Sequence, residues 1–186
     1  MLTNKDHGQS NCFLATAHAL ATTDPSVEVH FATFKGFDKF ITEANEHIVK
    51  TNPNARPIVY QEVQGMSMAE GLNHHFERLD IPRKKEYLPL SYLASPLTTT
   101  NTMAAIRDTV YVLIPYSGPQ IVEIYNSIVA ILEDVKPDLI VLDCLFTPGL
   151  TALTKLGLPY ICLSPNTCKD FSMSAQTKIT RMKLPG

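Results

Sequence analysis

Short apolar runs alternate along the chain with stretches in which apolar residues recur every three or four positions. In the run 27–33, the alternation of Val27, Val29 and Phe31 with other residues is typical of a strand. The run 139–142 is apolar throughout, as in a central parallel strand that is buried on both faces. The pattern predicts strands at 1–4, 27–33, 57–62, 138–143 and 159–163.

Amphipathic helices are expected between these strands. Ser10 or Asn11 can cap the first helix, so the stretch KDHGQSN before it is expected to be a polar loop. The alternation of strands and helices favours an α/β fold with a parallel sheet, doubly wound in the Rossmann-like manner. Helices are expected at 10–24, 36–52, 66–80, 102–114, 118–138 and 147–157.

Composition narrows the class of protein. The 186 residues suit a single domain, and 45% of them are apolar and 18% charged, as in ordinary globular chains. A net charge of -2 argues against a nucleic-acid partner. The four cysteines form no CxxC pair, so no metal site is expected. No signal peptide or membrane span is visible, and a cytoplasmic protein is the expectation.

Candidate chemistry lies where strands end. Ligands of an open doubly wound sheet bind at the carboxyl ends of the strands, where strand order reverses. If the first and fourth strands are neighbours there, His7 and Asp143 share one edge, and a histidine beside a carboxylate can act as a general base. Two plainer alternatives stay open: His7 as an exposed loop residue, and Asp143 as a carboxylate that accepts nearby amides.

Other motifs are missing from the first loop and the rest of the chain. A single glycine in HGQSN does not make the GxGxxG of a dinucleotide site, and neither a P-loop nor GxSxG occurs. The sequence therefore gives no reason to expect a bound nucleotide cofactor or a serine nucleophile.

Three ordered segments carry a resemblance to a known family. They are HGQSNCFLATAHALA, VEVHFAT and PDLIVLDCLFTPGLTALTKLGLPYICLSPN. Together they resemble the amino-terminal, acceptor-binding domain of fungal-type UDP-dependent glycosyltransferases of family 1. The resemblance implies one half of a GT-B fold, with residues 1–186 as a single acceptor-binding domain. It implies that the chain is truncated and that the carboxyl-terminal donor domain is absent.

The resemblance also implies a mechanism and site residues. A histidine supported by Asp143 would deprotonate a hydroxyl of a small lipophilic acceptor, which then displaces UDP from a hexose with inversion. The family pattern Gly-His-x-x-Pro, laid on GQSNC, puts Gln9 at the histidine, with His7 two residues earlier. Gln9 can bind an acceptor by hydrogen bonding but cannot act as a base. The UDP-sugar is a co-substrate that the donor domain would mainly hold.

The sequence therefore leaves two functions open. The first is a UDP-glycosyltransferase whose isolated chain is inactive. The second is a catalytically silent α/β module that binds an apolar ligand or a partner protein. An exposed apolar face is expected where a second domain or partner would dock.

Overall fold

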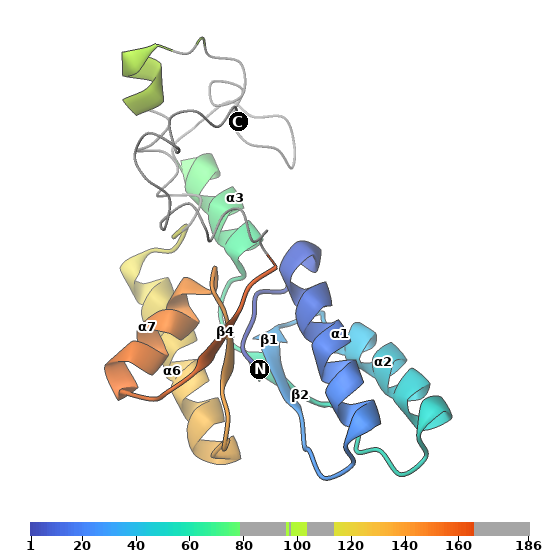
Figure 1. Ribbon diagram of the computed structural model, residues 1–186. Helices are drawn as coiled ribbons and strands as arrows, with labels where there is room; N and C mark the ends of the chain where they lie inside the picture. Colours follow the sequence, from blue (N-terminus) through green and yellow to red (C-terminus); the bar gives the residue numbers. More distant parts are fainter. Residues whose placement is uncertain (79–95, 97, 104–113, 166–186) are drawn as a thin grey trace, which may run out of the picture.

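The computed structural model describes residues 1–78, 96, 98–103 and 114–165 (Figure 1). Helices and short strands alternate along these ranges, and the strands that pair do so in parallel. The mixed α/β class expected from the sequence is therefore confirmed. The elements are α1 (His7–Thr23), β1 (His30–Phe34), α2 (Asp38–Thr51), β2 (Val59–Val63), α3 (Met68–Arg78), α6 (Gly118–Val135), β3 (Val141–Asp143), α7 (Thr147–Leu156) and β4 (Ile161–Leu163).

The strands form two parallel pairs. In the first, β1 pairs with β2, with His30 opposite Val59. In the second, β3 pairs with β4, with Val141 opposite Ile161. Parallel neighbours need a crossover between them, and α2 and α7 supply it in the two pairs.

The first residues of the chain link these two pairs. Leu2 makes parallel bridges to Ala32 of β1 and to Leu142 of β3. Its amide donates to the Val141 carbonyl at 2.8 Å, and its carbonyl accepts from the Asp143 amide at 2.9 Å. The first and fourth expected strands are thus neighbours, as predicted, although the first consists of isolated bridges.

Two apolar cores lie on opposite sides of the strands. Side chains of a strand alternate between its faces, so Phe31 of β1 packs into one core and Ala32 and Phe34 into the other. Helices α1 and α2 cover the first core and α6 and α7 the second (Figure 1). The first core includes Phe13, Ala17, Phe37, Ile41 and Ile48, and the second Val63, Ile124, Ile128, Leu142 and Phe146.

The start of α1 corrects one prediction. The helix begins at His7 with Asp6 as its N-cap, so Gly8 and Gln9 lie in its first turn and not in a polar loop. The cap is not Ser10 or Asn11. The amides of Gln9 and Ser10 both donate to the Asp6 carbonyl at 2.9 Å, and these bonds begin the helix before the expected cap.

Other expectations are met in part. Helix α3 lies inside the expected helix 66–80, where Ser67 and Glu70 form a capping pattern. The expected helix 102–114 falls largely outside the described residues. No helix in the described ranges is long and apolar enough to cross a membrane.

Candidate functional site

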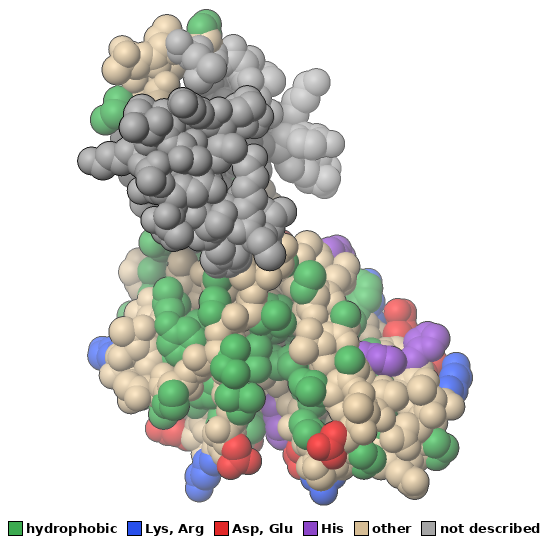
Figure 2. All heavy atoms as spheres, viewed as in Figure 1, with side chains coloured by type: hydrophobic (Ala, Val, Ile, Leu, Met, Phe, Trp, Pro, Cys, Tyr) green, Lys and Arg blue, Asp and Glu red, His purple; other side chains and the backbone are tan. Residues whose placement is uncertain are grey.

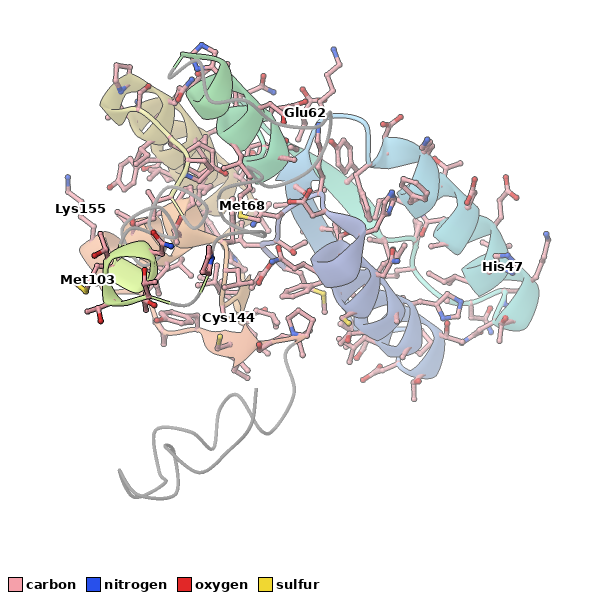
Figure 3. The ribbon with its side chains drawn as sticks, turned by 90° about the horizontal axis from the view of Figure 1, so that it is seen from above. His47, Glu62, Met68, Met103, Cys144 and Lys155 are labelled. Carbon is pink, nitrogen blue, oxygen red and sulfur yellow. The ribbon has the colours of Figure 1, made fainter. Side chains whose placement is uncertain are left out.

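Polar side chains gather at the carboxyl ends of β3 and of residues 1–6, which we call the first segment. They come from the first segment, the start of α1, the start of α3, Tyr116 and the end of β3. In Figure 3, which looks onto this end of the molecule, Met68 lies near the middle, while His47 and Lys155 lie at opposite sides. We call the group the carboxyl-end cluster, and its members are Thr3, Asn4, Lys5, Asp6, Gln9, Ser67, Glu70, Tyr116 and Asp143.

Asp143 is the buried centre of this cluster. It ends β3 and has no exposed surface. Its carboxylate accepts a hydrogen bond from the Thr3 hydroxyl at 2.9 Å and another from the Leu145 amide at 2.9 Å. Burial raises the pKa of the Asp143 carboxyl, although hydrogen bonds from Leu145, Thr3 and the Asn4 amide act in the opposite direction.

His7 is placed differently. It is the first residue of α1 and is exposed, and its ring lies edge-on to the Phe40 ring with centroids 5.1 Å apart. No hydrogen bond or ion pair within the described ranges joins His7 to Asp143. The proposed pair of His7 and Asp143 stays a prediction.

Gln9 turns inward from the first turn of α1. It is 8% exposed, and its side-chain oxygen accepts a hydrogen bond from the Asn4 amide nitrogen at 3.2 Å. Because the Asn4 backbone amide also donates to Asp143, Asn4 links Gln9 to the buried carboxylate. Gln9 thus belongs to a hydrogen-bond network around Asp143.

Asp6 and Glu70 add two further carboxylates to the cluster. Burial raises the pKa of the Asp6 carboxyl; the charge of Lys5 opposes this, and the charges of Asp143 and Glu70 reinforce it. Glu70 is held differently, because Lys5 Nζ lies 2.7 Å from its Oε1. Burial acts to raise the pKa of Glu70, but hydrogen bonds from Lys5 and Ser67 leave it below the ordinary value.

Three buried polar atoms of the cluster have no hydrogen-bond partner within the described part of the chain. They are Asn4 Oδ1, Asp6 Oδ2 and the Tyr116 hydroxyl, and Thr33 Oγ1 near the end of β1 is a fourth such atom. Native proteins leave few buried polar atoms unpaired, so a group of them at one end of the strands is a candidate binding feature.

Asp6, Glu70 and Tyr116 of the carboxyl-end cluster were not predicted from the sequence. Asp6 directly precedes a helix, and an acidic residue before an amphipathic run is an N-cap signal. Ser67 and Glu70 have the spacing of a capping box, which is also visible in sequence. Tyr116 precedes a helix start, and no sequence pattern connects it to residues more than a hundred positions away.

A hollow lies at the opposite, amino-terminal ends of the strands. Its volume is about 590 Å³, and its lining includes Val29, Leu139 and Val141 with the charged Arg56 and Lys136. Among its polar groups, Glu28 contacts His30 at 2.9 Å and Arg56 at 3.2 Å. We call this region the amino-end hollow. No group of three or more metal-binding side chains occurs among the described residues at either end.

Comparison with known proteins gives no family assignment. No protein-family model matches the chain, and no curated protein matches it. The function is therefore argued from the residues and their arrangement.

Proposed function

We propose that the chain is the acceptor-binding half of an inverting UDP-sugar transferase. The observation that carries the proposal is the buried Asp143, which ends β3 directly beside the segment that leads to His7 and Gln9. A carboxylate at this place is what the resemblance to family 1 glycosyltransferases requires. The candidate site residues are Asp143 and His7 for catalysis and Gln9 for acceptor binding.

The pairing of strands supports the fold that this proposal requires. Because Leu2 bridges β1 and β3, the strands follow the order β2, β1, first segment, β3, β4. Helices on both sides of such an order are consistent with a Rossmann-like doubly wound sheet, in which ligands bind beside the first segment. This sheet would be one half of a GT-B fold, with the UDP-sugar held mainly by a second domain or chain.

The proposed reaction is the inverting transfer that the resemblance implies. A base removes the proton of the acceptor hydroxyl, and the oxygen forms a bond to the anomeric carbon of the sugar. The bond from that carbon to the UDP oxygen breaks, and UDP leaves with the electron pair. Attack opposite the leaving group inverts the anomeric carbon. Asp143 would support the base electrostatically and would not itself touch the sugar.

The experiment is a transfer assay on the longest product of the gene and on the 186-residue chain. With UDP-glucose and a panel of lipophilic phenols, we expect turnover only where a donor-binding segment is present. Asp143→Asn and His7→Ala are each expected to lower kcat by about 10²-fold or more, the usual size for loss of a base or its support. His47→Ala, at the far side of the molecule, is the control.

Two outcomes contradict the proposal. Robust turnover by the 186-residue chain alone would show that no donor half is needed. Wild-type kcat in both Asp143→Asn and His7→Ala would remove the pair from the mechanism.

An exposed apolar surface favours a second candidate function. Leu139 and Ile161 are 59% and 55% exposed, and Tyr160, which precedes Ile161, is 38% exposed. Figure 2 shows hydrophobic side chains gathered over the face on which β4 lies. Such a surface suits the alternative, a catalytically silent module that binds a partner protein. Loss of partner binding in Ile161→Asp, with no sugar transfer by any gene product, would favour it.

A further inference from the structure

The carboxylate of Asp6 does not cap α1, although Asp6 stands at the N-cap position. An aspartate at an N-cap normally accepts a hydrogen bond from an amide of the first helical turn. Asp6 has the backbone of an N-cap, but its side chain makes no cap hydrogen bond. Its carbonyl takes that part instead, accepting from the amides of Gln9 and Ser10 and from the Ser10 hydroxyl at 3.0 Å. The carboxylate is therefore available for another role.

Two more polar atoms of the carboxyl-end cluster are available in the same way. Asn4 is 1% exposed, and its amide nitrogen is bound to Gln9, which leaves Asn4 Oδ1 without a partner in the described ranges. The buried Tyr116 hydroxyl is also unpaired there, and it lies close enough to Asp6 and Glu70 for their charges to act on it.

The position of Tyr116 depends on a glycine. A Cβ atom at Gly71 of α3 would come within 3.0 Å of the Pro115 carbonyl oxygen and 3.2 Å of the Tyr116 ring. Only glycine leaves room for this approach without displacement, so the ring is packed against α3 while its hydroxyl stays unpaired. The unpaired hydroxyl is thus held in place by packing.

The charges around these three atoms restrict what can bind them. Asp6, Glu70 and Asp143 are carboxylates, while the nearby Lys5 is already bound to Glu70 at 2.7 Å. The Asn4 and Asp6 oxygens accept hydrogen bonds, and the Tyr116 hydroxyl can donate or accept. A suitable ligand must therefore donate hydrogen bonds and carry no negative charge.

We propose that Asp6, Asn4 and Tyr116 form a binding site for the hydroxyl group of an uncharged ligand, with Asp6 Oδ2 as the acceptor of its hydrogen bond. The identification of this ligand as the sugar acceptor rests on the proposed function.

Binding of three probes of similar size tests the site in the 186-residue chain. Benzyl alcohol donates a hydrogen bond, benzoate is an anion without a donor, and toluene has no polar group. Titrations followed by amide NMR signals are expected to give a dissociation constant for benzyl alcohol at least about fivefold lower than for the other two, because only it meets the unpaired acceptors. The signals of the Asn4 side chain and of the first turn of α1 should shift.

Variants assign the preference to Asp6. Asp6→Asn keeps a good N-cap residue, so α1 should stay folded, and it should bring the dissociation constant for benzyl alcohol to within about twofold of that for toluene. Tyr116→Phe removes one hydroxyl, so it should weaken the binding of benzyl alcohol and leave the binding of benzoate and toluene unchanged. Two controls, Asp24→Asn at the far end of α1 and His47→Gln in α2, should bind like the wild type.

The outcomes separate this site from the proposed function. The site is overturned if benzyl alcohol does not bind, if benzoate binds as well, or if both Asp6→Asn and Tyr116→Phe leave the preference intact. If the preference depends on Asp6 but no gene product transfers sugar, the proposed function fails and the hydroxyl site stands.

Discussion

The polar side chains at the two ends of the strands differ in how deeply they are buried and in how they are paired. Beside the amino-end hollow, Glu28 binds His30 at 2.9 Å and Arg56 at 3.2 Å, and its side chain is 51% exposed. In the carboxyl-end cluster, Asp143 and Asn4 are 0% and 1% exposed, and their hydrogen bonds run through the interior. The amino-terminal end thus has an exposed group of paired charges. The carboxyl-terminal end has, beside the exposed pair of Lys5 and Glu70, buried polar groups, some without partners in the described ranges.

This difference indicates which end of the strands is suited to bind a ligand. Paired and exposed charges contribute little to stability and are easily replaced. Buried polar groups are costly unless every partner is present, so a chain that keeps several of them gains something other than stability. The amino-end hollow has an open volume of about 590 Å³, but the unpaired buried polar atoms of Asn4, Asp6 and Tyr116 belong to the carboxyl-end cluster. Matched substitutions at the two ends test this difference.

The largest expected effect comes from removing the buried carboxylate. Asp143→Ala deprives the Thr3 hydroxyl and the Leu145 amide of their acceptor. Leaving such buried donors unpaired should lower the free energy of unfolding by about 3 kcal/mol. Urea denaturation followed by circular dichroism measures the change, and Asp143→Asn, which keeps an acceptor oxygen, should lose clearly less.

The matched change at the other end is Glu28→Ala. It breaks two contacts at distances as good as those of Asp143, but in solvent. The free energy of unfolding should stay at the wild-type value within the error of the measurement. Equal losses in Glu28→Ala and Asp143→Ala would remove the contrast between the two ends.

A smaller effect is expected at the start of α3. The buried Ser67 hydroxyl is paired with Glu70 Oε2 at 2.8 Å, and Glu70 also holds Lys5. Ser67→Ala should lower the free energy of unfolding by about 1 kcal/mol, as for other helix caps. Ser26→Ala removes a hydroxyl that donates to the exposed Asp24 at 2.7 Å near the amino-end hollow, and it should have a much smaller effect. Urea denaturation of both variants compares the two hydroxyls.

Hydrophobic periodicity was sufficient to predict most of the fold. The apolar run 139–142 indicated β3, but the strand begins only at Val141, and Leu139 is 59% exposed, so the expected burial of the whole run on both faces was wrong. The apolar face of 118–138 indicated α6, because this pattern follows from helix geometry. Predicting that the first segment lies beside β3 required a rule about strand order, and the bridges of Leu2 bear it out.

The site was less predictable, because its contacts join distant parts of the chain. Thr3 and Asp143 are 140 positions apart, and no local pattern pairs them. The start of α1 was misplaced because the serine and asparagine in KDHGQSN are as good N-caps as Asp6, and hydrogen bonds to the Asp6 carbonyl decide between them. That choice moved Gln9 from an expected loop into a buried first turn.

The smallest expected effect has the most specific pH dependence. The pKa of Asp6 is raised above its ordinary value of 3.8, so the folded chain holds this proton more tightly than the unfolded chain does. At low pH both states are protonated and the residue has no effect, whereas above the folded pKa its charge destabilises the fold. Asp6→Asn should therefore stabilise the chain near pH 7, by less than about 1 kcal/mol because solvent screens a half-buried group, and should change nothing near pH 3.

The exposed Asp24 is expected to affect stability near pH 7 in the direction opposite to Asp6. The hydrogen bonds from Ser26 lower the pKa of Asp24, so its charge favours the folded chain above the unfolded pKa, and this contribution is lost as the pH falls through the folded pKa. Asp24→Asn should then destabilise slightly near pH 7, in the range where Asp6→Asn stabilises. Urea denaturation of both variants at several pH values between about 3 and 7 measures the two trends. If both variants shift stability in the same direction near pH 7, the Asp6 carboxylate is not buried among like charges, and the proposed hydroxyl site loses its electrostatic basis.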